Sequence, residues 1–137
     1  MTSVLNVDTI ADKAGTGPVS LTKQIAAKMW SCFNGTGTVA TNGSFNQSTL
    51  TDNGTGDQTV AFTNNMNNDD YSSTGTCLGG STDGTNYSIF GAENTSAAVT
   101  KTSSNVQCTS GYVSNTTAAA AHINHQEMNL VIHGDLA

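Results

Sequence analysis

The stretch SFNQSTLTDNGTGDQTVAF, residues 44–62, decides the fold of this chain. Two runs of strand-forming residues flank the polar segment Asp52–Asp57. Within that segment, Asn53-Gly54 supplies the positive backbone angle that a tight hairpin needs, and Gly56 allows a bulge. The stretch therefore predicts a β-hairpin without any chemical motif. Its two expected strands are residues 44–50 and 58–62.

The composition of the whole chain favours the same class of fold. Charged residues make up 10% of the 137 residues where roughly 25% is usual, and hydrophobic residues make up 36% where roughly 45–50% is usual. Thr, Ser, Asn and Gly fill the difference; Thr favours strands, and Asn and Gly favour turns. Because charges are few and Pro18 is the single proline, the composition is not that of a disordered chain. We expect one all-β domain with many tight connections.

Upstream of the hairpin, the sequence predicts an extended arm and one short helix. Residues 1–20 alternate apolar and polar side chains and end in the breaker AGTGP. Over residues 21–30, Leu21, Ile25 and Met29 recur every four residues on one face, which predicts a helix. We therefore assign residues 1–30 to an extended arm and a short helix, separate from the module that follows.

From Trp30 onward the apolar period returns to two, so Trp30 and Cys32 share one face of a strand, with Trp30 expected to anchor the core. The run EMNLVIHG at 127–134 fits a buried closing strand. We predict a β-sandwich or jelly-roll-like module over residues 31–137. Its other expected parts are an exposed loop at 63–70, a glycine-rich connection at 75–86 and strands at 87–92, 97–101, 105–108 and 111–114.

The charge pattern excludes several classes of partner. The formal net charge is −6, with four Lys and no Arg. Because nucleic-acid and anionic-membrane binding need clustered cations, neither partner is expected. No apolar run reaches the roughly 18 residues of a membrane span, and MTSVLNVDTIADKAG lacks the features of a signal peptide. We expect synthesis in a host cytoplasm and no membrane insertion.

Cysteines and histidines leave alternatives open. Cys32, Cys77 and Cys108 fit no metal or redox motif, and free, partly buried thiols are favoured over a bridge between Cys77 and Cys108. The histidines lie in HINHQEMNLVIH, where the HxxH spacing could hold a transition metal. Polar surface or interface histidines are the favoured reading. They are His122, His125 and His133.

Nothing in the sequence predicts an enzyme. Asp69-Asp70 is the one adjacent acidic pair, and it lies in the polar loop, where a solvated role is favoured. No GxSxG elbow and no phosphate-binding glycine loop is present. We therefore expect no catalytic residues, no cofactor and no assigned metal site.

Two long segments resemble a known group of proteins. LNVDTIADKAGTGPVSLTKQ at 5–24 and FNGTGTVATNGSFNQSTLTDNGTGDQTVAFTNNMNNDDY at 33–71 are similar to segments of tail-fibre and other virion-surface proteins of tailed phages, marine and cyanobacterial ones above all. The shared motifs keep their order along about half of the chain. They are Val7–Ile10, Gly15–Pro18, Lys23–Trp30, Phe33–Val39, Ser44–Asn46, Thr51–Asp57, Val60, Phe62, Met66 and Tyr71.

The resemblance implies a virion component, a homotrimer that displays a β-rich module on the tail or capsid surface. A short tail fibre that attaches to a host carbohydrate or envelope protein without catalysis is the first expectation. A capsid decoration or head-fibre protein is the alternative, and a capsule-degrading enzyme is a distant third. Other tail or capsid proteins would be further partners.

Two sets of contact residues follow from this reading. Amides, carboxylates and hydroxyls of the polar loop suit polyhydroxylated receptors. A small core cannot bury every apolar side chain, so self-association would bury the apolar side chains of the arm and helix. The expected receptor contacts are Asn64, Asn65, Asn67, Asn68, Asp69, Asp70 and Tyr71. The expected oligomer or docking contacts are Leu5, Val7, Ile10, Leu21, Ile25 and Met29.

Overall fold

The computed structural model describes residues 26–79, 86–92, 101–114 and 120–135. Within these ranges the regular elements are all strands and none is a helix, so the all-β prediction is confirmed. The strands are β1 (Met29–Asn34), β2 (Ala40–Phe45), β3 (Gln47–Gly54), β4 (Asp57–Phe62), β5 (Ser72–Leu78), β6 (Asn86–Ala92), β7 (Asn105–Ser114), β8 (Ala120–His122) and β9 (Glu127–His133).

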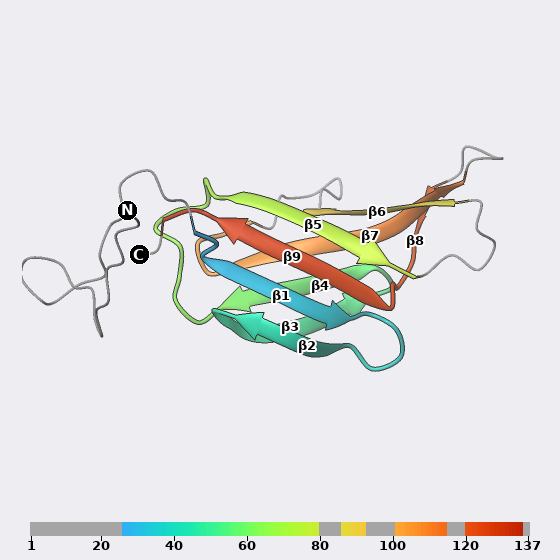
Figure 1. Cartoon of the computed structure of the whole chain (residues 1–137), viewed down its shortest axis with the longest axis horizontal. Helices are drawn as coiled ribbons and strands as arrows, with labels where there is room; N and C mark the ends of the chain where they lie inside the picture. The colour runs from blue at the N-terminus through green and yellow to red at the C-terminus, as the bar shows by residue number, and fades with distance from the viewer. Residues whose placement is uncertain (1–25, 80–85, 93–100, 115–119, 136–137) are drawn as a thin grey trace, which may run out of the picture.

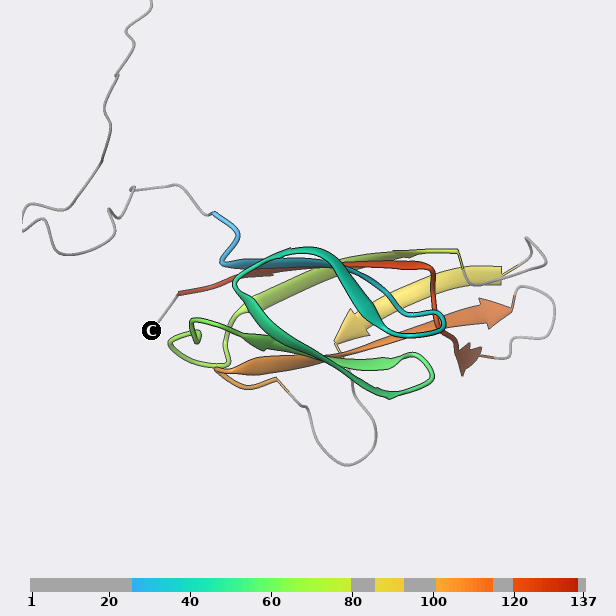
Figure 2. The same cartoon turned by 90° about the horizontal axis from the view of Figure 1, so that it is seen from below.

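The strands form two antiparallel sheets that lie face to face. The first sheet has the order β2-β1-β9-β5, and the second has the order β3-β4-β7-β6, with β8 paired to β7. Figure 1 shows β9 and β1 crossing over β7 and β4. Figure 2 shows the two layers edge on, with β2 and β3 running from one layer to the other at one side. The described part of the chain is therefore a β-sandwich.

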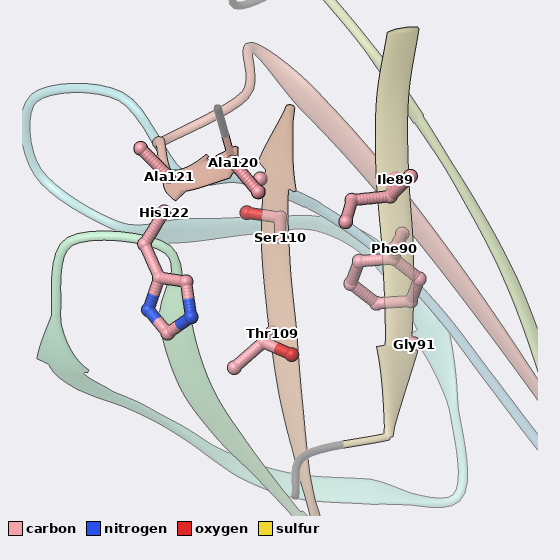
Figure 3. Close-up of a pocket in the computed structure, with 9 residues that line it drawn as sticks. Ile89, Phe90, Gly91, Thr109, Ser110, Ala120, Ala121 and His122 are labelled. Atoms are coloured by element: carbon pink, nitrogen blue, oxygen red, sulfur yellow. The ribbon is translucent and has the colours of Figure 1, made fainter. Parts of the chain in front are cut away.

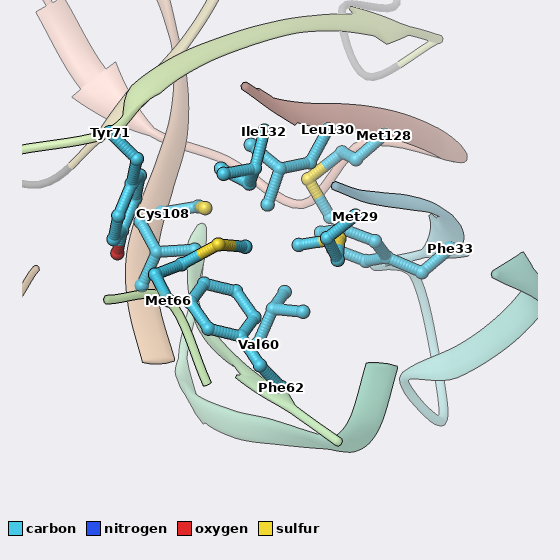
Figure 4. Close-up of a cluster of buried hydrophobic side chains, with 11 residues drawn as sticks. Met29, Phe33, Val60, Phe62, Met66, Tyr71, Cys108, Met128, Leu130 and Ile132 are labelled. Atoms are coloured by element: carbon cyan, nitrogen blue, oxygen red, sulfur yellow. The ribbon is translucent and has the colours of Figure 1, made fainter. Parts of the chain in front are cut away.

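The core lies between the two sheets and is built by strict alternation. On β9, Met128, Leu130 and Ile132 are buried and point to the second sheet, whose Val60 and Val106 are fully buried. Figure 4 shows Met128, Leu130, Ile132 and Val60 meeting between the layers. Alternation explains how a chain so poor in apolar residues still forms a closed core, because the inward positions of these strands are apolar in succession. The closing strand predicted at 127–134 is confirmed as β9.

The hairpin of residues 44–62 is confirmed at its turn, where β3 and β4 pair. Gly54 and Gly56 have positive φ angles of 141° and 66°, and the register shifts between Asp52 and Gly54. Gly56 is also held by the second sheet, because its amide donates to Asn124 Oδ1 at 2.6 Å. A Cβ on Gly56 would stand 2.3 Å from the Ser110 carbonyl oxygen, so no other residue fits there.

The first expected strand of the hairpin, residues 44–50, is divided between the two sheets. Phe45 ends β2 in the first sheet and Gln47 begins β3 in the second. Asn46 makes the corner with a φ of 59°, and its side-chain amide donates to the carbonyls of Lys28 and Asn64, each at 3.0 Å. Asn tolerates this backbone region because its short polar side chain can bond to nearby backbone groups.

The helix expected over 21–30 is wrong in its described part. Residues 21–25 lie outside the described ranges, and Met29 already begins β1. Met29 pairs with Ile132 of β9, and the Lys28 amide donates to the Ile132 carbonyl at 2.8 Å. Pairing with a distant strand outweighs the weak four-residue period, because local propensity is a small term beside tertiary contacts. The boundary expected between residues 30 and 31 falls inside β1.

Three smaller expectations change in the downstream half. Residues 75–78, expected in a connection, belong to β5, and the two short strands expected at 105–108 and 111–114 are one strand, β7. The strand expected at 87–92 is confirmed as β6. Of the strand expected at 97–101, the described residue is Lys101, which forms an isolated bridge with Val106.

Candidate functional site

The outer face of the first sheet carries an exposed aromatic pair. Along β1 the residues Met29, Ser31 and Phe33 point into the sandwich, so Trp30 and Cys32 point out. Trp30 is 42% exposed, and its expected role as a core anchor is therefore wrong. The reason is the register of β1, which gives the inner positions to Met29 and Phe33.

Phe45 stands directly opposite Trp30 on the neighbouring strand β2. It is 54% exposed, so two large aromatic side chains lie side by side on the surface. On the other side of Trp30 the ladder continues through Val131 of β9 to Thr74 of β5. Phe45, Trp30, Val131 and Thr74 form one row across the whole sheet.

Gly43 has no side chain and so leaves room for the indole of Trp30. A Cβ built on Gly43 would stand 3.4 Å from the Cη2 and Cζ3 atoms of Trp30. The Cη2 and Cζ3 atoms of the indole therefore lie over Gly43 of β2, two residues along the strand from Phe45, and a branched side chain at position 43 would occupy the same space.

A second row of uncharged polar groups lies beside the aromatic row. Cys32 pairs with Gly43 on one side and with Asn129 on the other, and Asn129 pairs with Thr76. Alternation places the side chain of Glu127 on the same side of β9 as Asn129. The side-chain amide of Asn129 donates a hydrogen bond to Glu127 Oε1 at 2.8 Å. The two rows together are called the aromatic face below: Phe45, Trp30, Val131 and Thr74 with Gly43, Cys32, Asn129 and Thr76.

The polar loop between β4 and β5 is exposed and is tied to the same end of the sheet. The backbone N–H of Asn64 donates to Asn46 Oδ1 at 2.7 Å, and Asn46 directly follows Phe45. Met66, in the middle of the loop, is buried and its amide donates to the Ser103 carbonyl at 2.8 Å. The expected receptor contacts that are exposed are Asn64, Asn65, Asn67, Asn68, Asp69 and Asp70.

Tyr71, the last expected receptor contact, belongs to the core. It is 3% exposed, and its hydroxyl donates to the Asn105 carbonyl at 2.9 Å. The Lys101 ammonium lies 4.7 Å from the ring centroid and donates to the Tyr71 carbonyl at 2.7 Å. Burial raises the pKa of Tyr71 above its usual range, with the nearby Cys108 and Asp69 acting in the same direction. Tyr71 fastens the loop and presents no surface to a receptor.

The expected oligomer and docking contacts are not brought together in the described structure. Met29 is fully buried in the sandwich. The remaining ones lie outside the described ranges, so their role stays a prediction: Leu5, Val7, Ile10, Leu21 and Ile25.

The three histidines occupy different environments. His125 is fully buried, and burial lowers its pKa, while the backbone at Ile123 opposes that shift. His122 is exposed on β8, and His133 is half-buried at the end of β9. In the described ranges no three His, Cys, Asp or Glu side chains are grouped to hold a metal ion.

A hollow of about 380 Å³ lies along β7 in the second sheet, between β6 and β8. Ile89, Gly111 and His122 are partners across these strands, and the missing side chain of Gly111 leaves room for the β8 backbone, since a Cβ there would stand 2.6 Å from the Ala121 carbonyl oxygen. Figure 3 shows His122 on one side of β7 and Ile89 and Phe90 on the other. Its lining offers one imidazole, the Thr109 and Ser110 hydroxyls and no carboxylate, which is too little for an acid–base pair.

The cysteines are free thiols, as the sequence predicts. Cys32 and Cys77 are half-buried and Cys108 is buried. Burial raises the pKa of Cys77, and burial together with the nearby Asp57 raises the pKa of Cys108 to about 12. Thiols held protonated in this way are poor nucleophiles.

Comparison with known proteins gives no family for this chain. No protein-family model matches it, and neither a curated protein nor a solved structure does. No helix in the described ranges is long and apolar enough to cross a membrane. The aromatic face therefore has to be interpreted from its own chemistry.

Sequence reasoning missed the aromatic face because it missed Phe45 and placed Trp30 inside. A signal for it was present in MWSCFN, residues 29–34, since a strand that buries Met29 and Phe33 must expose Trp30. Nothing in the sequence indicated that Phe45 is the neighbour of Trp30, because Phe45 joins the first sheet only through the corner that the chain makes at Asn46.

Proposed function

We propose that this chain is a non-catalytic attachment module of a virion surface that binds its target through the aromatic face. The observation that carries the proposal is the pairing of Trp30, 42% exposed, with Phe45, 54% exposed, on the outer face of the first sheet. Single exposed apolar residues need no explanation, but adjacent large aromatics on a surface are typical of recognition sites.

The sequence resemblance supplies the biological setting of the proposal. The segments of this chain that resemble phage virion-surface proteins include Phe33–Val39, Ser44–Asn46 and Thr51–Asp57, which here form the end of β1 with its connection to β2, the corner after Phe45 and the β3–β4 turn. Host attachment from a short tail fibre is the role that such proteins suggest. The exposed part of the polar loop, tied to the corner at Asn46, would extend the contact surface.

The proposal keeps the finer fold and assembly expected from the sequence. The first and last described strands, β1 and β9, are neighbours in the middle of one sheet. A homotrimer would present three aromatic faces and so raise the avidity of attachment to a surface. Light scattering on the full-length protein measures the number of copies directly.

Binding of the labelled, full-length protein to a panel of bacterial cells, cyanobacteria included, tests the function. We expect saturable binding that is lost in the double variant Trp30→Ala, Phe45→Ala. The matched control is Leu78→Ala, Ile89→Ala, which removes two exposed apolar side chains from other places, 66% and 50% exposed, and should leave binding unchanged.

Two outcomes would contradict the proposal. Equal loss of binding in both double variants would mean that general surface hydrophobicity, not the aromatic face, holds the protein on cells. A wild-type protein that ignores every cell type but binds empty capsids would make it a decoration protein instead.

A further inference from the structure

We infer that the ligand of the aromatic face is an uncharged sugar ring, stacked on Trp30 and Phe45 and hydrogen-bonded by the polar row beside them. The inference rests on the proposed function and narrows it to one class of ligand. Three properties of the face lead to it: its size, the spacing of its groups and its charge.

The apolar part of the aromatic face is too small for a stable protein interface. Aromatic side chains bury roughly 150–250 Å² each when they are fully covered, so two half-exposed rings offer on the order of 200 Å². A stable protein–protein interface covers about 800 Å² on each partner. The other exposed large apolar residues of the described ranges are Leu78 and Ile89. Leu78 is on the same face of the first sheet, but on β5, two strands from Trp30 and on the far side of the polar row, and Ile89 is in the second sheet, so neither is continuous with the aromatic pair.

The spacing of the two rows suits a ring with polar substituents around an apolar face. Trp30 and Phe45 sit on adjacent strands about 4.8 Å apart, and the polar row follows two residues along the strands, roughly 7 Å away. Asn129 lies on β9, one strand from Trp30, so its amide is the nearer hydrogen-bonding group for a sugar ring whose C–H face covers the indole. Thr76 lies a further strand away on β5, within reach of a second ring of an oligosaccharide. Amides and hydroxyls both donate and accept, which matches hydroxyl groups on a ligand.

The charge of the face favours a neutral ring over an anionic one. Neither row contains a Lys or Arg. The nearest cation in sequence is Lys28, two residues before Trp30, and alternation places it on the side of the aromatic row away from the polar row. Glu127 is the carboxylate beside the polar row, and its Oε1 accepts from Asn129. An anionic group at the polar row would therefore lie near a carboxylate, on a chain of net charge −6.

The chain carries its own probe for this site. Trp30 is the only tryptophan in the sequence, so intrinsic tryptophan fluorescence reports on the aromatic face and on no other place. A sugar that stacks on the indole removes water from it and shifts its emission. The signal can be followed without any label and in the full-length protein.

The experiment titrates the protein with methyl glycosides of glucose, galactose and mannose, with a neutral β-glucan and with polygalacturonate as the anionic probe. We expect a saturable emission shift with at least one neutral probe and none with polygalacturonate. Electrophoresis through gels that contain the same polysaccharide gives the affinity of variants that lack the indole. Phe45→Ala and Trp30→Ala should each weaken binding by at least about tenfold, equal to roughly 1.4 kcal/mol, and Leu78→Ala should not.

The outcomes separate a failure of this inference from a failure of the proposed function. If cells bind the protein through Trp30 and Phe45, but no neutral sugar shifts the emission and protease treatment of the cells abolishes binding, the ligand is a protein and the sugar inference is overturned. Preference for polygalacturonate would overturn it as well. If the double variant of Trp30 and Phe45 still binds cells as the wild type does, the proposed function itself fails at this face.

Discussion

The two faces of the first sheet differ sharply although the same strands build both. On β1 and β9 the inward side chains, among them Phe33, Met128 and Ile132, are completely buried. The outward side chains one position away are exposed, as Trp30 is, or half-buried, as Asn129 is. Alternation on a single ladder thus separates a core from a candidate binding surface by the thickness of one sheet.

This difference teaches where stability and recognition reside. Side chains between the sheets lose their packing partners when they are truncated, whereas those outside lose only partial contact with neighbours on one face. Changes to the two faces should therefore separate cleanly in experiment, with unfolding free energy following the inner face and binding following the outer one. Four measurements test that separation, in order of decreasing effect.

The largest effect is expected from a matched pair of phenylalanines. Phe33 is fully buried and meets the ring of Phe90 edge-on, with 6.4 Å between centroids, whereas Phe45 is 54% exposed. Phe33→Ala should lower the free energy of unfolding by about 3–5 kcal/mol. Phe45→Ala should lower it by less than about 1 kcal/mol. Denaturant unfolding of both variants measures the difference, and similar losses would show that the two faces are not separate.

A matched pair of glycines comes next. A Cβ on Gly75, on the inner side of β5, would stand 2.1 Å from the Phe90 ring and 2.7 Å from the Asn129 carbonyl oxygen. Gly75→Ala should therefore destabilise the fold by about 1–3 kcal/mol, because the carbonyl cannot move aside. Gly43→Ala, whose Cβ would stand 3.4 Å from Trp30 on the outer side, should change stability by less than about 0.5 kcal/mol. Thermal or chemical unfolding decides, and equal effects would contradict the comparison.

The sequence alone predicted the elements of the fold that depend on residues close together in the chain. The turn after Asn53 needs positive backbone angles at Gly54 and Gly56, which few other residues allow. The run EMNLVIHG at 127–134 is the most apolar one in the later part of the chain, which is typical of a buried strand. Both were predicted before any distant contact was considered.

The sequence-based predictions are wrong where a contact between residues distant in the chain determines the local structure. Met29 fits a helix of period four as well as a strand, and its pairing with Ile132, more than a hundred residues away in the chain, selects the strand. The same pairing turns Trp30 outward. The corner at Asn46 moves Phe45 into the first sheet through bonds to the backbone of Lys28 and Asn64. The aromatic face depends on all of these, so the local signal in residues 29–34 becomes decisive only once the distant pairing selects the strand.

The inner face should also control how stability responds to pH. His125 is fully buried and its folded-state pKa lies below 6.5, so the unfolded chain binds a proton first as the pH falls. Stability is therefore complete above pH 6.5 and declines below it, by up to about 1.4 kcal/mol per pH unit, until the folded-state pKa is reached.

Unfolding of the wild type and of His125→Gln between pH 5.5 and 8 tests this dependence. The variant should be less stable at every pH but should lose the decline contributed by residue 125, while His122 and His133 remain in both proteins as a common background. A decline of the same slope in both proteins would assign the effect to the other histidines.

The smallest effect on stability is expected where the effect on function should be greatest. Trp30 and Phe45 keep 42% and 54% of their surface in solvent, so the double variant Trp30→Ala, Phe45→Ala gives up little burial and should change the free energy of unfolding by no more than about 1–2 kcal/mol. Circular dichroism and denaturant unfolding check this on the same samples used for cell binding. If the double variant unfolds much more easily, the aromatic pair is a structural element, and its loss of binding would say nothing about recognition. If it keeps its fold and loses only attachment, the outer face is maintained for its ligand, since the sandwich has no structural need of two exposed aromatic rings.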